Sequence, residues 1–190
     1  MSLLSTRQLS RHFGGLKAVE NVDFDLPTGQ VRALIGPNGA GKTTFVGMLS
    51  GRIPASNGQV MFEGRNITAE PAHRRIRAGM AYTFQITSVF GRLPVTENVA
   101  LAMRWRTGGD EAETKRRVAE SLDRVGIADR ADQLAGDLSY GHQRLLVIAM
   151  GLSQDPRLLS LDEPPQGLAH SEPTDCIALI RRSAGVMPTP

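Results

Sequence analysis

A glycine-rich segment, GPNGAGKT at residues 36–43, carries the clearest chemical signal in the chain. Its glycines let the backbone curl until successive N–H groups point inward, which is the arrangement that binds phosphate oxygens. The N-terminus of a following helix would add partial positive charge at the same place. Lys42 can then reach the β- and γ-phosphates, and the Thr43 hydroxyl can ligate Mg²⁺. The spacing therefore predicts a nucleoside triphosphate site.

A second reactive group is the acidic pair Asp162 and Glu163, which ends the apolar run LLSLDE at residues 158–163. A carboxylate at the C-terminal end of a parallel strand faces the ligand crevice. We expect Asp162 to hold Mg²⁺ through a water molecule and Glu163 to polarise an attacking water. Taken alone, such a pair is more often a solvated turn. The phosphate loop upstream favours the catalytic interpretation.

These groups can meet only if strands and helices alternate along the chain. The apolar run VRALI, residues 31–35, leads directly into the glycine-rich loop and predicts a buried strand. Further strands are expected at 58–64, 79–85 and 157–163, and helices at 42–51, 144–154 and 173–185. This alternation predicts an α/β fold with a parallel sheet.

The middle of the chain, about residues 87–139, reads as a helical insertion. Asp110 with Glu113 three residues later resembles a capping box. Apolar residues then recur at helical spacing until Gly126, where the helix is expected to end.

Composition narrows the class of protein. The chain has 190 residues, a net charge of +3 and a single cysteine, Cys176, so no disulfide can form within it. Its longest apolar run, residues 145–152, falls far short of the ~20 residues that span a bilayer. We therefore expect a cytoplasmic protein that reaches the membrane only through a partner. The basic segment 73–79 is expected to be a solvated helix face, with no nucleic-acid partner.

With LSYGHQR at residues 138–144, the order of motifs resembles the ATP-binding cassette ATPases. The resemblance runs from about residue 3 to residue 182. Residues 13–44 and 83–99 look most like the ATP-binding subunits of branched-chain amino-acid importers, including their urea and amide relatives. The resemblance implies a P-loop NTPase (RecA-like) fold in one domain, 1–190. Its nucleotide-binding core is expected at 1–86 and 140–190, with a helical signature subdomain at about 87–139.

The resemblance also implies roles for individual residues. Phe13 would stack on adenine, although it could instead be a core residue near an early strand. Gln85 would contact Mg²⁺ and the attacking water and sense the transmembrane partner, or it is only a polar strand end. Ser139 and Gly141 would contact the γ-phosphate held by the opposite subunit, and Ser139 would cap its helix in either case.

Taken together, the expected site residues fall into three groups. Catalysis would use Glu163, Gln85 and Lys42, and Mg²⁺ would be held by Thr43, Gln85 and Asp162. ATP would be bound by Phe13, Gly36, Pro37, Asn38, Gly39, Ala40, Gly41, Lys42, Thr43, Thr44, Ser139 and Gly141.

Two of the departures from the family pattern concern histidine. His142 stands where the signature usually has Gln. The family also has a switch histidine beyond the helix that we expect to end near Gly185, and none of the four histidines follows that helix. Pro188 and Pro190 would interrupt a central strand there. We therefore expect a C-terminally truncated domain with its last core strand missing.

Two functions stay open on these residues. One is an ATPase subunit of an importer, with a second ATP-binding subunit and permease subunits as partners and a solute-binding protein acting indirectly. It would lie on the inner face of the plasma membrane. The other is a truncated nucleotide-binding module with little or no ATPase activity. A soluble cassette ATPase of DNA repair or translation would need a second cassette or zinc-binding insertions, which this sequence does not contain.

Overall fold

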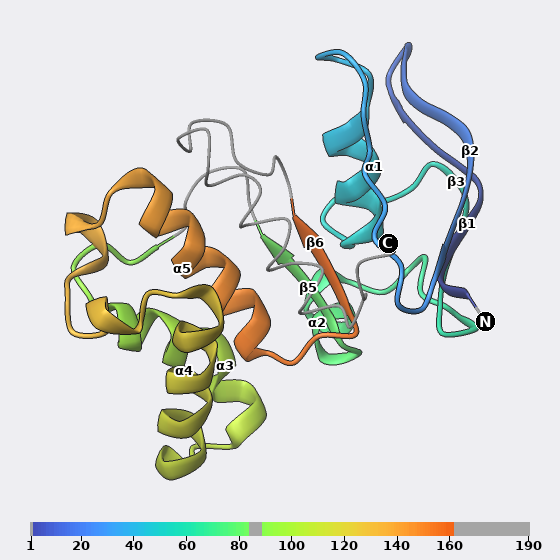
Figure 1. The fold of residues 1–190 in the computed structure, drawn as a ribbon. Coiled ribbons are helices and arrows are strands. Elements are labelled where there is room, and N and C mark those ends of the chain that lie inside the picture. The colour runs from blue at the N-terminus through green and yellow to red at the C-terminus, as the bar shows by residue number, and fades with distance from the viewer. Residues whose placement is uncertain (1, 84–88, 162–190) are drawn as a thin grey trace, which may run out of the picture. The chain divides into compact units, whose positions relative to one another are not determined.

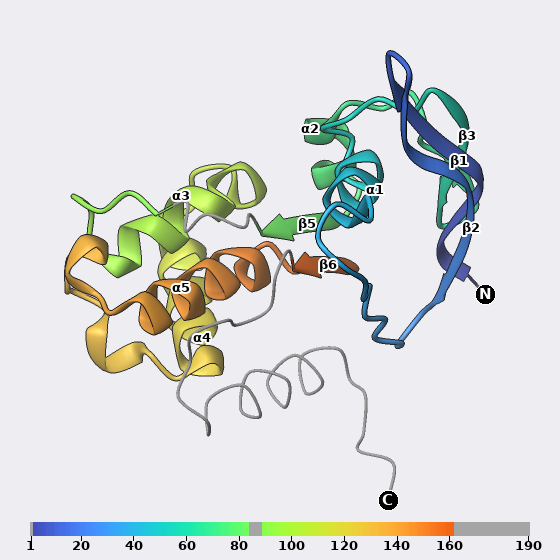
Figure 2. The same cartoon turned by 90° about the horizontal axis from the view of Figure 1, so that it is seen from above.

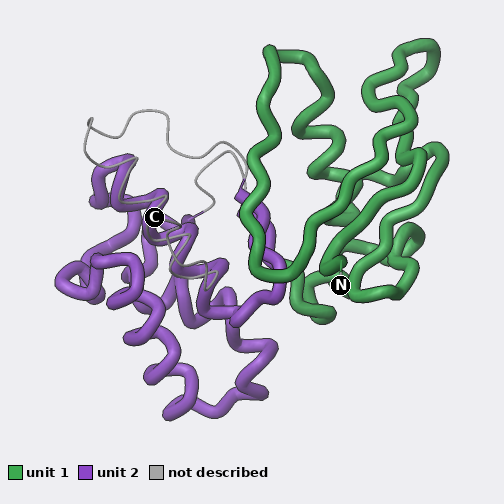
Figure 3. The backbone as a smooth tube through the Cα atoms, turned by 45° about the vertical axis from the view of Figure 1, so that its right-hand side comes forward, with its two compact units in different colours: residues 1–80, 180–190 green, residues 81–179 purple. Residues whose placement is uncertain are grey.

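The structure, a computed structural model, describes residues 2–83 and 89–161. Gln85, Asp162 and Glu163 lie outside the described residues, and so does the helix predicted at 173–185. The described chain divides into two compact units, and the division falls between Met80 and Ala81 (Figure 3).

The first unit is built on an antiparallel sheet with the strand order β2-β1-β3-β4 (Figure 1). Its strands are β1 (Ser2–Phe13), β2 (Leu16–Pro27), β3 (Asn57–Phe62) and β4 (Arg65–Asn66). The β1–β2 hairpin turns through two glycines and pairs Phe13 with Leu16. Leu4, Leu9 and Val60 are among its buried core residues. Strand β3 confirms the strand predicted at 58–64, whereas the hairpin was not predicted.

Helix α1 (Lys42–Leu49) follows the glycine-rich loop, as predicted. It buries a continuous stretch from Phe45 to Leu49. The Phe45 ring meets Phe24 of β2 edge to face, with ring centroids 5.7 Å apart. This aromatic contact anchors the helix to the hairpin, so the loop that leads into α1 is also held at a fixed place on the sheet.

Residues 31–35 do not form the strand that their apolar sequence predicts. The segment has no regular structure, and Ile35 is 93% exposed. An apolar run becomes a buried strand only if neighbouring strands accept and donate its backbone hydrogen bonds. Within the described residues the sheet of this unit contains only β1 to β4, and none of them pairs with 31–35. The prediction is therefore wrong for the structure described.

The second unit contains three packed helices, α3 (Val95–Thr107), α4 (Glu111–Val125) and α5 (Tyr140–Ser153) (Figure 2). Short 3₁₀ turns, η1 (Ala128–Arg130) and η2 (Ala135–Asp137), lie between α4 and α5. The core is lined by apolar side chains from all three helices, including Val99, Leu122 and Leu146. These helices confirm the prediction of helical structure in the middle of the chain and at 144–154.

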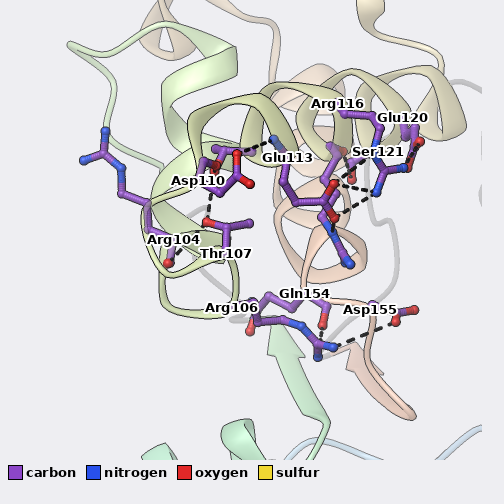
Figure 4. A network of polar contacts seen from close by, with 12 residues as sticks. Arg104, Arg106, Thr107, Asp110, Glu113, Arg116, Glu120, Ser121, Gln154 and Asp155 are labelled. Atoms are coloured by element: carbon purple, nitrogen blue, oxygen red, sulfur yellow. Dashed lines mark hydrogen bonds and ion pairs between the residues drawn. The ribbon is translucent and has the colours of Figure 1, made fainter.

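Helix α4 begins and ends as its sequence predicts. The Asp110 side chain accepts a hydrogen bond from the Glu113 backbone N–H at 3.0 Å, and Gly126 takes the left-handed conformation that ends the helix. Glu113 also pairs with Arg116 and Arg117 (Figure 4). Hydrogen bonds from Arg117 and then Arg116 lower the pKa of the Glu113 carboxyl. Such surface pairs contribute little to stability because water screens them.

Two further strands, β5 (Met80–Thr83) and β6 (Leu158–Leu161), form a small parallel sheet (Figure 2). They match the described parts of the strands predicted at 79–85 and 157–163. The parallel pair, with helices before, between and after other strands along the chain, confirms the α/β class. Strand β6 is half-buried rather than buried.

A final helix of the first unit, α2 (Ala72–Arg77), follows Pro71. Within residues 2–83 and 89–161, no helix is long and apolar enough to cross a membrane. The same residues hold no cluster of three or more histidine, cysteine, aspartate or glutamate side chains placed to bind a metal.

Candidate nucleotide-binding site

The glycine-rich loop folds back around the side chain of Lys42. The Lys42 Nζ donates hydrogen bonds to the backbone carbonyls of Gly36 at 2.7 Å and Pro37 at 2.8 Å. The loop residues 36–40 are exposed. The ammonium group is therefore held inside the curl of an accessible loop, where it can meet an anionic ligand.

The N-terminus of α1 opens into this loop without a side-chain cap. Gly41 is the N-cap residue and contributes no side-chain hydrogen bond. The first helical bond runs from the Phe45 N–H to the Gly41 carbonyl at 2.8 Å. The preceding N–H groups of the first turn have no partner within a helix, and they carry the positive end of its dipole. This donor set fits phosphate oxygens.

Gly41 also fixes where the loop lies. Its backbone has a φ of 82°, which side-chain-bearing residues rarely adopt. A Cβ atom at this position would collide with the Ala18 carbonyl oxygen of β2 and would lie 3.2 Å from Val19 Cγ2. Only glycine allows this close approach, so the loop is seated directly against the β1–β2 hairpin.

Phe13 lies at the end of β1 on the same hairpin. The residue is 44% exposed, and the guanidinium carbon of Arg11 lies 4.4 Å from the centroid of its ring. An exposed aromatic ring on this hairpin is accessible to a base, and the stacking role of Phe13 stays a prediction. The alternative of a buried core phenylalanine does not match this exposure.

The predicted Mg²⁺ ligands are only partly within the described chain. Thr43 is exposed in the first turn of α1, next to Lys42. Its hydroxyl is a hard oxygen donor of the kind that Mg²⁺ prefers. Asp162 and Gln85, the other predicted ligands, lie outside the described residues, as does the predicted catalytic Glu163.

The signature residues Ser139 and Gly141 stand at the N-terminus of α5. The Ser139 hydroxyl accepts a hydrogen bond from the backbone N–H of His142 at 3.4 Å, so Ser139 caps the helix. The same hydroxyl lies 2.7 Å from Nδ1 of the His142 ring. Their contact with the nucleotide of an opposite subunit stays a prediction.

Arg75 of α2 is a buried arginine that the sequence did not reveal. Its guanidinium donates to the carbonyls of Met48 and Leu49, each at 2.8 Å, and to those of Thr68 and Glu70. Met48 and Leu49 end α1, so this side chain caps the C-terminus of the phosphate-loop helix.

The expectation of a solvated basic face over 73–79 holds for His73, Arg74 and Arg77, which are exposed, but not for Arg75. Its side chain is 3% exposed, and burial lowers the pKa of its guanidinium, which the nearby Glu70 partly offsets. A run of arginines in a short helix gives no sign of which one turns inward. In the structure, Gly51 leaves the space that this side chain fills, since a Cβ atom there would lie 2.7 Å from the Arg75 Nε.

Comparison with known proteins agrees with this geometry. The model of the ABC transporter family matches residues 19–166. The high-affinity branched-chain amino acid transport ATP-binding protein BraF of Pseudomonas aeruginosa is 34% identical over 194 residues, covering 95% of this chain and 76% of BraF. LivG of Escherichia coli, with the same description, is 35% identical over 192 residues, covering 94% and 75%.

An ATP-binding protein of another kind of importer is also similar. The sulfate/thiosulfate import ATP-binding protein CysA of Acinetobacter baylyi is 36% identical over 164 residues, covering 85% of this chain and 46% of CysA. Among solved structures, an ATP-binding cassette in its ADP conformation has a TM-score of 0.85 and 26% identity, covering 97% of this chain and 78% of that one. A nucleotide-free cassette has a TM-score of 0.88 and 25% identity. The chain belongs to the ATP-binding subunits of the ABC transporter family.

Proposed function

We propose that this protein binds and hydrolyses ATP as a subunit of an importer for branched-chain amino acids. The observation that carries the proposal is the accessible loop curled around Lys42 at the uncapped N-terminus of α1. The similarity to BraF and LivG, which are branched-chain amino acid transport ATP-binding proteins, supports the choice of solute. The similarity to CysA supports a role in import but does not favour one solute.

The described residues would act mainly by binding and orienting the nucleotide. The loop N–H groups and the Lys42 ammonium would hold the β- and γ-phosphates, and Phe13 would stack on the adenine. The Thr43 hydroxyl, with Asp162 and Gln85, would hold Mg²⁺. When bound, Mg²⁺ supplies positive charge that offsets the charge developing on the phosphates.

Hydrolysis would need a group that accepts a proton from water. We assign this role to Glu163, with Gln85 orienting the water that attacks the γ-phosphorus. The bond from that phosphorus to the bridging oxygen breaks, and ADP and inorganic phosphate leave. Positioning and electrostatic stabilisation would supply most of the rate enhancement.

The cycle would involve two ATP-binding subunits. Ser139 and Gly141 of one subunit would face the γ-phosphate held by the other, because a helix N-terminus offers donors and partial positive charge to an anion. The movement of the two subunits as they dimerise around ATP would then be transmitted to permease subunits in the membrane. A solute-binding protein would act through those permease subunits.

The test compares ATP hydrolysis by the wild-type chain with that of Glu163→Gln. A matched control is Glu120→Gln, which changes an exposed carboxylate paired with Arg116 on α4. We expect phosphate release by the wild type and by Glu120→Gln, and at least a hundredfold lower rate for Glu163→Gln. If all three proteins bind Mg-ATP and none hydrolyses it, the protein is a nucleotide-binding module and not an ATPase.

A further inference from the structure

The charged side chain of Arg11, on β1, packs against the aromatic ring of Phe13. Its guanidinium carbon lies 4.4 Å from the centroid of Phe13. Within residues 2–83 and 89–161, its Nε is buried and has no hydrogen-bond partner. Leaving a buried donor unpaired is costly, so the contact with the ring must help to hold the side chain in this position.

The register of the hairpin places this pair beside the phosphate loop. Arg11 of β1 lies directly opposite Val19 of β2, and directly opposed residues in an antiparallel pair project from the same face. Val19 is one of two residues of β2, with Ala18, that border Gly41 of the loop. Arg11, Phe13 and the loop therefore share one face of the hairpin.

Arg11 covers one face of the Phe13 ring, yet 44% of Phe13 is still exposed. A base that stacks on Phe13 must therefore use the surface that Arg11 leaves open. A planar guanidinium behind the ring restricts its rotation, and part of the ordering cost of binding is removed before the ligand arrives.

We propose that Arg11 is a positioning residue that holds Phe13 ready to stack on the base of a nucleotide. The inference rests on the proposed nucleotide site and adds a residue to it. Stacking carries no donor and acceptor code, so the contribution of Arg11 is expected to be the same for ATP and GTP. The site would therefore select a flat base at this position, whichever purine it is.

Calorimetric titration of the full chain with Mg-ATP, Mg-GTP and inorganic tripolyphosphate tests the proposal. Because a cation–π contact to a partly exposed ring contributes about 0.5–1 kcal/mol, Arg11→Ala should raise the Kd for both nucleotides about two- to fivefold. The Kd for tripolyphosphate, which has no base, should not change. Arg7→Ala is the matched control, since Arg7 is exposed on the same strand, and it should bind all three ligands as the wild type does.

Two further variants separate positioning from a role in folding. In a Phe13→Ala background, Arg11→Ala should cause no further loss of nucleotide affinity. Arg11→Lys keeps the charge but loses the planar group, and it should restore only part of the affinity. The inference is overturned if Arg11→Ala binds nucleotides with the wild-type Kd, or if it weakens the binding of tripolyphosphate as much as that of the nucleotides. It is also overturned if Arg11→Ala lowers nucleotide affinity by the same factor in the Phe13→Ala background. If the wild type binds no nucleotide, the proposed function fails, and this inference fails with it.

Discussion

Two helices in this protein begin where a phosphate is expected to bind, and they begin differently. Helix α1 starts at Gly41, which has no side chain to cap it. Helix α5 starts at Ser139, whose hydroxyl accepts from the His142 N–H. The uncapped end leaves all of its first-turn donors to a ligand, whereas the capped end has already used one. We infer that α1 can bind phosphate within one chain and that α5 contributes only when a second subunit brings the phosphate to it.

The opposite ends of the two helices resemble each other. Arg75 caps the last carbonyls of α1, and Arg106 of α3 donates to the Gln154 carbonyl, just beyond α5, at 2.7 Å (Figure 4). A positive charge at a helix C-terminus also opposes the helix dipole. The two caps differ in depth, because Arg75 is buried and Arg106 is partly exposed. Burial should make the α1 cap the more costly one to remove.

The largest expected effect is therefore that of Arg75→Ala. Removing the guanidinium takes one donor from each of four carbonyls, two of them in buried contacts, which we expect to lower the free energy of unfolding by about 3 kcal/mol. Arg106→Ala should cost about 1 kcal/mol, because water can replace its hydrogen bond. Urea unfolding followed by circular dichroism measures both values.

Arg74→Ala is the matched control for Arg75, since the two residues are neighbours in α2. Arg74 is exposed and makes a surface ion pair with Glu70 at 3.3 Å. Its loss should change the unfolding free energy by less than about 0.5 kcal/mol. We expect Arg75→Ala to lower the free energy of unfolding more than either other variant does. If Arg74→Ala or Arg106→Ala lowers it by the same amount, burial does not set the cost of removing the α1 cap.

A smaller effect is expected at the start of α5. Ser139→Ala removes a helix cap and should lower the unfolding free energy by about 1 kcal/mol. The affinity of a single chain for Mg-ATP should stay as it is, because α1 binds without Ser139. Ser139→Asn, which keeps a capping side chain, should recover most of the stability. A weaker Kd for Mg-ATP in the monomeric Ser139→Ala protein would show that the two helix ends are not independent.

The sequence was most informative where structure is local. The spacing of residues 36–43 predicts both the loop and the start of α1, because the glycines and the helix lie in one continuous segment. Asp110 and Gly126 likewise predict the ends of α4, since a cap is set by residues a few positions apart. These features need no knowledge of distant parts of the chain.

It was least informative where partners are distant. Bulges interrupt the β1–β2 pairing at several positions, so the alternation that would reveal the hairpin is lost. The apolar segment 31–35 has the composition of a strand but no strand neighbour within the described chain. Arg75 meets carbonyls 26 and 27 residues away, and nothing in its own sequence neighbourhood indicates that contact.

The central claim is that the loop around Lys42 binds the phosphates of ATP, and the most direct test is the Kd for Mg-ATP. The chain has three lysines, so Lys42→Ala can be compared with Lys115→Ala, which changes an exposed lysine of α4. We expect Lys115→Ala to bind like the wild type and Lys42→Ala to bind at least tenfold more weakly, about 1.4 kcal/mol. Equal affinities in all three proteins, each confirmed to be folded by circular dichroism, would contradict the account.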